Sequence, residues 1–176
     1  PGPGTARALQ TQGVPADRID GPPEDAAQFD SEALWGVVGP GLRPGHRVLV
    51  VRGGGPAAQV GDAGQGRDWL AQRCVAAGAV VDSCVAYRRV RPVWSVTDTT
   101  RAQQAVNQGA VWVFSSSEAV GHLAILWPET PWQRLRALAT HPRIAQTLRD
   151  RGVTDLRTVR PTLPDVLSGL ESAGHG

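Results

Sequence analysis

The sequence predicts an α/β protein with parallel β-sheets, and three segments carry this prediction. Residues 48–51 are a continuous apolar run, as expected of a parallel strand that is buried on both faces. Residues 67–77 have the spacing of an amphipathic helix that Gly78 ends, and residues 80–85 begin the next strand. Residues 110–114 are a second apolar run and predict another fully buried strand. Strands that alternate with helices in this way indicate parallel pairing.

The two halves of the chain resemble each other, which favours two similar α/β units. Residues 5–14 align without gaps with residues 144–153, and each segment predicts a helix that a Gly-Val pair closes before a strand. A second helix follows in both halves, over residues 31–38 with Ser31 as its N-cap and over residues 164–170. The alternative is that any two amphipathic helices of an α/β protein look alike, but the later segments also match in order.

The remaining segments complete the predicted fold. Residues 93–109 are expected to be mostly helical, and residues 115–118 are expected to cap the helix that follows the second apolar run. Residues 127–132 contain two prolines and predict a loop. Residues 134–139 fit either a short helix or a strand.

The composition excludes several classes of protein. Hydrophobic residues make up 41% of the 176 residues, enough for a packed core. All 18 basic residues are arginines and 16 residues are acidic, so the net charge is +2, and no basic run of the kind that binds nucleic acid occurs. No apolar stretch approaches the roughly 20 residues of a membrane span. Cys74 and Cys84 lack metal-ligand spacing and are expected to be reduced core thiols of a cytoplasmic protein.

The ends of the first two predicted strands hold one candidate site, because ligands of parallel sheets bind outside the carboxyl ends of the strands. Arg52, Gly53 and Gly54 end the first strand, where missing side chains let a ligand approach the backbone. The spacing matches neither a phosphate-binding Walker loop nor a dinucleotide-binding fingerprint, so the loop is a generic anion site. Tyr87, the only tyrosine, ends the second strand and can donate a proton to a leaving group. The alternative for Tyr87 is packing with its hydroxyl at the surface.

A second candidate site follows the strand at residues 110–114. Ser115, Ser116 and Ser117 precede a helix, whose first-turn amides and dipole form a small anion site. Plain N-capping is the alternative, and the sequence alone favours it. His141, ahead of Arg143 at a predicted helix start, is the one histidine that we place near a pocket. The others show no metal pair, so no metal site is expected: His46, His122 and His175.

Seven short motifs occur in one order along most of the chain, and together they resemble the uroporphyrinogen-III synthase family. Each motif is weakly specific by itself, but their shared order is difficult to produce by accident. They are Gly-x-x-Thr-Ala at Gly2 to Ala6, Ser-Glu-x-Leu at Ser31 to Leu34, Arg52-Gly53 with Gly66-Arg67, Gly78 to Val81 before Tyr87-Arg88, Phe114 to Ser116, His141 to Ala145, and Pro161-Thr162.

The resemblance implies a domain organisation. Members have two flavodoxin-like parallel-sheet α/β domains joined by a two-strand connector, one domain being inserted in the other, with a cleft between them. Residues 1–89 would then be the inserted domain, incomplete at its start, and residues 90–92 the connector. Residues 93–176 would be the outer domain without its first strand and helix. The chain starts at Pro1 and contains no methionine, so we expect the sequence to lack its N-terminal part.

The resemblance also implies an activity. Such enzymes close hydroxymethylbilane, a linear tetrapyrrole, into uroporphyrinogen III with inversion of ring D and loss of water, without a cofactor or metal. Tyr87 would be the catalytic acid. We expect a cytoplasmic monomer that binds this small molecule and neither nucleic acid nor membrane. Residues that would contact the substrate's carboxylates are Thr5, Arg52, Gly53, Gly54, Ser115, Ser116, Ser117, His141, Arg143 and Thr162.

Two other functions remain open from the sequence. One is a non-catalytic module of the same fold that binds a tetrapyrrole or another anion, such as the sensor half of a regulator. The other is a part of a fused methyltransferase–synthase.

Overall fold

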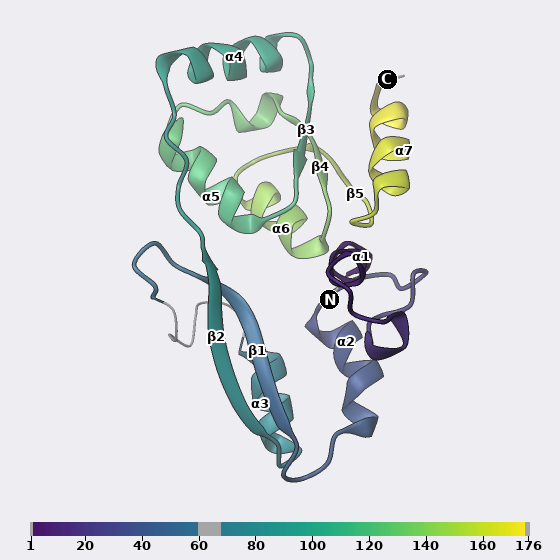
Figure 1. The fold of residues 1–176 in the computed structure, drawn as a ribbon. Coiled ribbons are helices and arrows are strands. Elements are labelled where there is room, and N and C mark those ends of the chain that lie inside the picture. Colours follow the sequence, from purple (N-terminus) through teal and green to yellow (C-terminus); the bar gives the residue numbers. More distant parts are fainter. Residues whose placement is uncertain (1, 60–67, 175–176) are drawn as a thin grey trace. The chain divides into compact units, whose positions relative to one another are not determined.

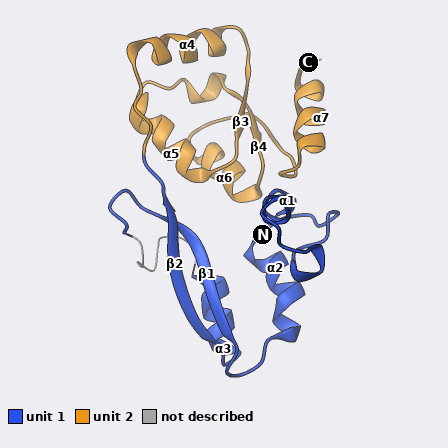
Figure 2. Ribbon diagram, in the orientation of Figure 1, with its two compact units in different colours: residues 1–90 blue, residues 91–176 orange. Residues whose placement is uncertain are grey.

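The computed structural model describes residues 2–59 and 68–174, and it is a mixed α/β structure with parallel sheets (Figure 1). The chain divides into two compact units, residues 1–90 and residues 91–176 (Figure 2). The first unit contains a sheet of two strands and the second a sheet of three strands. The predicted fold class is therefore confirmed at the level of parallel α/β structure.

The first unit contains the parallel strands β1 and β2, connected by a helix. The pairing runs from Arg47 opposite Val80 to Gly54 opposite Arg88, with a register shift after Arg52. The elements of this unit are α1 (Pro3–Thr11), α2 (Ser31–Val38), β1 (Arg47–Gly54), α3 (Trp69–Ala76) and β2 (Val80–Arg88), with 3₁₀ turns at Ala16–Arg18 and Gly39–Gly41.

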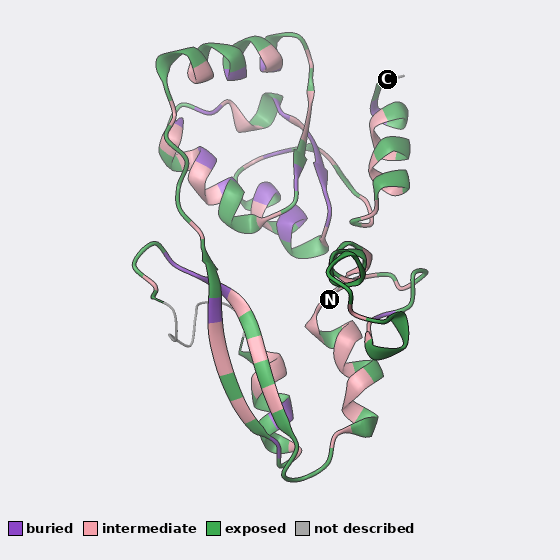
Figure 3. Ribbon diagram, viewed as in Figure 1, coloured by how far each residue is buried: buried purple, intermediate pink, exposed green. Residues whose placement is uncertain are grey.

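The prediction that the first strand is buried on both faces is wrong. Along β1, Leu49 and Val51 are each 61% exposed, whereas Val48 and Val50 are half-buried (Figure 3). Helix α3 packs against β2 and covers one face of the sheet. Since side chains alternate between the two faces of a strand, cover on one face leaves every second residue of β1 exposed.

Helix α3 begins two residues later than expected, at Trp69, with Asp68 in the N-cap position. The predicted helix start at Arg67 and the Gly66-Arg67 motif lie outside the described residues, as does His175. Gly78 ends the helix with φ of +84°, a conformation that favours glycine. On the helix, Cys74 is a free and buried thiol, and burial raises its pKa.

The segment before β1 differs from the prediction in two places. Helix α2 spans the expected residues, but its N-cap is Asp30, whose Oδ1 accepts a hydrogen bond of 3.0 Å from the Ala33 amide. Asp and Ser are equally good N-caps, so the sequence does not separate adjacent candidates. The strand predicted after Val14 is wrong, because a 3₁₀ turn follows Pro15 instead. Proline cannot donate to a strand ladder.

The second unit is built around a parallel sheet with the strand order β3-β4-β5. Its elements are α4 (Val96–Asn107), β3 (Val111–Phe114), α5 (Ser117–Leu126), β4 (Arg136–Ala139), α6 (Pro142–Asp150), β5 (Asp155–Thr158) and α7 (Leu163–Gly174), with a 3₁₀ turn at Trp132–Arg134. The segment at residues 134–139, for which helix and strand were both possible, thus contains the central strand of this sheet.

The side chains of β4 alternate between the two faces of the sheet, and helices pack against both faces. Ala137 and Ala139 belong to the core that α4, α5 and α6 supply. Leu138 points to the other face, where Gly169 of α7 lies so close that a Cβ there would be 3.2 Å from Leu138 Cδ1. The prediction of a fully buried β3 is wrong, since Val113 is 45% exposed. Within residues 2–59 and 68–174, strand β3 pairs with β4 alone and is therefore at the edge of this sheet.

Helix α4 starts with a capping box. The Asp98 amide donates to Ser95 Oγ, and the Ser95 amide donates to the Asp98 carboxylate over 2.9 Å. Hydrogen bonds from Ser95 lower the pKa of Asp98 below its usual value.

The stability that Asp98 contributes should therefore be present above about pH 4 and lost as the pH falls through its lowered pKa. Measured by thermal unfolding, the difference between wild type and Asp98→Asn should shrink from pH 7 to pH 3.

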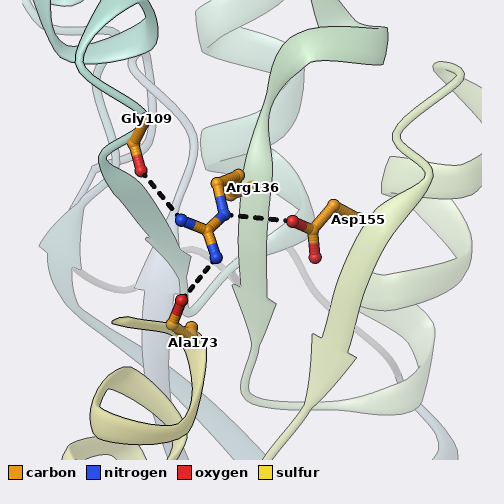
Figure 4. A network of polar contacts seen from close by, with 4 residues as sticks. All are labelled: Gly109, Arg136, Asp155 and Ala173. Carbon is orange, nitrogen blue, oxygen red and sulfur yellow. Dashed lines mark hydrogen bonds and ion pairs between the residues drawn. The ribbon is translucent and has the colours of Figure 1, made fainter. Parts of the chain in front are cut away.

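Arg136, at the start of β4, connects three elements at the amino-terminal end of the sheet (Figure 4). Its Nε donates to Asp155 of β5 over 3.1 Å, Nη1 donates to the Gly109 carbonyl over 3.4 Å, and Nη2 donates to the Ala173 carbonyl near the end of α7. A guanidinium supplies these donors in one planar group, so a single side chain fixes β5 and α7 to the central strand.

We predict that Arg136→Ala lowers the free energy of unfolding by about 1–2 kcal/mol, less than the sum of three charged hydrogen bonds because the ion pair is partly exposed. Chemical denaturation measures this loss. Arg157→Ala, on the neighbouring strand β5 where the arginine is exposed, is the matched control and should change stability little. Equal losses in both variants would contradict the role of Arg136.

Candidate functional site

The carboxyl ends of β3, β4 and β5 lie at one edge of the sheet in the second unit. Phe114, Ala139 and Thr158 are register partners, so the chain leaves all three strands at the same level. Each strand is followed by a helix, α5, α6 or α7, whose N-terminus belongs to this edge. The structure thus brings together the predicted site residues of this half of the chain, namely Ser115, Ser116, Ser117, His141, Arg143 and Thr162.

Ser116 is the N-cap of α5. Its Oγ accepts hydrogen bonds from the amides of Glu118 over 3.1 Å and of Ala119 over 3.4 Å. Ser117 Oγ lies 3.3 Å from Thr147 Oγ1 of α6, whose hydroxyl also donates to the Arg143 carbonyl over 2.9 Å. This contact joins the first residue of α5 to the second turn of α6. The N-capping alternative therefore describes the Ser116 side chain, and anion binding at this loop would depend on backbone amides.

His141 is the N-cap of α6 and Thr162 caps α7. His141 Nδ1 accepts from the Arg143 amide over 3.0 Å, and Arg143 Nη2 lies 3.4 Å from His141 Nε2. The Asp165 amide donates to Thr162 Oγ1 over 3.3 Å, while the Thr162 hydroxyl donates to the Asp165 carboxylate. Three capped helix N-termini at one edge give it positive potential, which suits carboxylate ligands.

Thr140 is a residue of this edge that the sequence analysis missed. It is 8% exposed, and it lies between the end of β4 and the His141 cap. Its amide donates to the Phe114 carbonyl over 3.1 Å, and its Oγ1 donates to the same carbonyl over 3.4 Å. A polar residue directly after an apolar strand and before a helix start was the signal available in the sequence.

The first unit places Tyr87 directly beside the glycines that end β1. Tyr87 is the register partner of Gly53, and a Cβ on Gly53 would lie 2.5 Å from Tyr87 Cε2. The space above Gly53 is thus filled by the Tyr87 ring. A Cβ on Gly54 would likewise collide with Ala58. Both positions therefore need glycine because residues of the chain itself, Tyr87 and Ala58, occupy the space that a side chain would take.

The phenol of Tyr87 remains accessible beside Gly53. The residue is 56% exposed and lines a pocket of about 490 Å³ together with Ala58, Gln59 and Arg88. Arg89 Nη2 donates to the phenol oxygen over 3.4 Å, and the guanidinium carbon lies 5.6 Å from the ring centroid. Arg89 thus places a positive charge beside the phenol.

Arg52 and Thr5 lie apart from this contact. Arg52 Nη1 forms an ion pair of 2.6 Å with Asp68 Oδ1 at the start of α3, and its side chain is 15% exposed. Thr5 is exposed on α1 and lines a pocket of about 290 Å³ with Gln10, Ile19 and Asp20. Asp68 thus already balances the charge of Arg52, which the sequence did not reveal.

Comparison with known proteins identifies one family. The sequence matches the family described as Uroporphyrinogen-III synthase HemD over residues 2–168, nearly the entire chain. The chain belongs to the uroporphyrinogen-III synthase family. No curated protein sequence matches it.

A solved structure similar to this family member is a mutant uroporphyrinogen III synthase from the extremely thermophilic bacterium Thermus thermophilus. The two are 20% identical, with a TM-score of 0.44. The match covers 97% of the present chain and 62% of that synthase, so the chain spans less than two thirds of its relative.

Two further features of the described residues concern metal-binding groups and membrane spans. Across residues 2–59 and 68–174, no group of three or more His, Cys, Asp and Glu side chains is arranged to hold a metal ion. Within the same part of the chain, no helix is long and apolar enough to cross a membrane.

The contact between Gly53 and Tyr87 gives a direct prediction for this family member. Gly53→Ala should displace the Tyr87 ring. If Tyr87 takes part in a reaction, this displacement should lower turnover about 10-fold, since small misplacements of a reacting group are costly. Gly36→Ala is the matched control, because a Cβ there meets nothing within 4 Å in helix α2. Turnover and melting temperature should be measured together. If Gly53→Ala retains full turnover, the position of the ring does not matter for the reaction.

Proposed function

We propose that the protein is a uroporphyrinogen-III synthase, which cyclises hydroxymethylbilane to uroporphyrinogen III with inversion of ring D and loss of water. The observation that carries the proposal is the family match over residues 2–168. We also propose the domain organisation of the family, with two flavodoxin-like domains joined by a two-strand connector and one inserted in the other. Residues 1–89 are then the inserted domain, residues 90–92 the connector and residues 93–176 the outer domain.

Tyr87 is the proposed acid of the first step. The bond between the ring A methylene carbon and its hydroxyl breaks, the phenol proton passes to the departing oxygen, and water leaves. The ring A pyrrole becomes an azafulvene cation, and Arg89, 3.4 Å from the phenol oxygen, stabilises the phenolate that remains. A positioned acid of this kind contributes typically 10²–10⁴-fold to a rate.

Ring inversion follows from the carbon that attacks the cation. The ring D pyrrole attacks through its substituted carbon and gives a spiro intermediate, which fragments and recloses in the inverted sense. The final closure releases one proton, which restores the Tyr87 phenol, so the net change is the loss of one water. The protein's main task is to hold the chain so that the less favoured carbon reacts.

The substrate's carboxylates are the proposed ligands of the electropositive edge in the second unit. Backbone amides of the loop at Ser115 to Ser117 and the Arg143 guanidinium are donors suited to carboxylates. His141 and Thr162 contribute by fixing the starts of α6 and α7. In the first unit the proposed contacts are Thr5, Arg52 and the backbone groups of Gly53 and Gly54, since Tyr87 and Ala58 cover the Cα atoms of these glycines. The Arg52 guanidinium would then bind a substrate carboxylate in addition to the carboxylate of Asp68.

The proposal includes a cytoplasmic monomer that needs neither a cofactor nor a metal for turnover. Incubation of the full-length protein with freshly generated hydroxymethylbilane, followed by isomer analysis, tests it. The expected product is the type III isomer without any added metal or cofactor. Only the type I isomer, which forms spontaneously, would reject the synthase and favour the sensor module that binds tetrapyrroles without reaction.

A further inference from the structure

We propose that Thr140 is a positioning residue that aims the Ser115 amide at a substrate carboxylate. The inference rests on the proposed function, because it assumes that the loop at Ser115 to Ser117 binds carboxylates. It assigns a role to a side chain that lies behind this loop. The hydroxyl acts through the peptide bond that precedes Ser115.

The burial of Thr140 is the first observation. Among the described residues, Thr140 and Thr130 are the two polar residues that are buried, at 8% and 6% exposure. A buried hydroxyl needs a hydrogen-bond partner, and the partner of Thr140 Oγ1 is the Phe114 carbonyl at 3.4 Å. The Thr140 amide already donates to this carbonyl over 3.1 Å, so the hydroxyl is a second donor beyond the strand ladder.

The position of this carbonyl is the second observation. The Phe114 carbonyl and the Ser115 amide belong to one planar peptide group, in which the C=O and N–H bonds point in opposite directions. Two donors from Thr140 hold the carbonyl, so they also fix the direction of the Ser115 N–H. Phe114 is the last residue of β3, where the ladder to β4 no longer holds the chain that follows.

A second contact holds the other end of the same loop. Thr147 Oγ1 of α6 lies 3.3 Å from Ser117 Oγ. Ser115 and Ser116 are therefore held between two contacts, from Thr140 on one side and from Thr147 on the other. Both contacts originate from the chain around α6, which also carries His141 and Arg143. The arrangement keeps the loop after β3 in a fixed relation to the start of α6.

Thr140→Val tests the role, because valine keeps the shape, and the residue 140 amide still bonds to the Phe114 carbonyl. Thr140→Ser restores the hydroxyl. Thr130→Val is the matched control, since the Thr130 hydroxyl also donates to a backbone carbonyl, that of Trp127 after α5. We expect Thr140→Val to raise KM for hydroxymethylbilane about 5–10-fold with kcat within about 2-fold. Thr140→Ser should restore KM, and Thr130→Val should lower the melting temperature alone.

Nuclear magnetic resonance of the Ser115 amide gives a readout that is independent of turnover. Thr140→Val should shift this amide signal and Thr130→Val should leave it in place. An unchanged Ser115 amide, or equal rises of KM in Thr140→Val and Thr130→Val, would overturn the positioning role. A wild-type protein that makes no type III isomer would instead reject the proposed function, and the amide measurement would still decide the role of Thr140.

Discussion

Replacement of Tyr87 with phenylalanine should slow the cyclisation about 10²-fold and leave the product isomer unchanged. The substitution removes the proposed proton donor but keeps the ring, whose close approach to Gly53 involves ring carbons as well as the hydroxyl. The choice of the attacking carbon depends on how the substrate is held, so the type III isomer should persist. Single-turnover kinetics with isomer analysis measures both quantities.

Thermal unfolding is the control for Tyr87→Phe, because the residue is 56% exposed and the loss of its hydroxyl should barely change stability. A variant with full activity would show that the phenol is a packing residue and that a bound water is the acid. A variant that produces the type I isomer would show instead that Tyr87 helps to hold the substrate.

Ser116→Pro should weaken catalysis much more than Ser116→Ala. Alanine removes the cap of α5, which typically costs about 1 kcal/mol of stability, but retains the backbone amide. Proline removes the amide donor, and it also requires φ near −65°, whereas Ser116 has φ of −155°. If backbone amides hold substrate carboxylates, kcat/KM should fall about 30-fold for proline and about 3-fold for alanine.

The N-cap of α4 supplies a matched control for this comparison. Ser95→Ala and Ser95→Pro alter a serine cap at the start of another helix of the second unit, and they should lower the melting temperature without changing KM. Negligible effects of both Ser116 variants on substrate binding would count against the loop as a carboxylate site.

The sequence predicted those features that depend on neighbours along the chain. The span of α2, the strand–helix–strand order and the capping role of the serines after β3 follow from local signals, and the structure confirms them. The segment at residues 134–139 remained undecided, because its strand, β4, has only four residues, too few for periodicity to separate a strand from a helix.

Features that depend on distant residues were not predictable in this way. The exposure of Leu49 and Val51 follows from cover on one face of the sheet, which a run of apolar residues does not specify. The contact of Tyr87 with Gly53 depends on the register between strands, including its shift after Arg52. The paired charge of Arg52 depends on Asp68, which lies 16 residues further along the chain.

The most direct test of the synthase function is the number of type III molecules formed per protein molecule. Freshly generated hydroxymethylbilane is supplied in large excess over the full-length protein, and the isomers are separated after oxidation. We predict many type III molecules per protein, with a yield per unit time that rises in proportion to protein concentration. A product that is type I alone at every protein concentration would contradict the synthase function, whatever the protein binds.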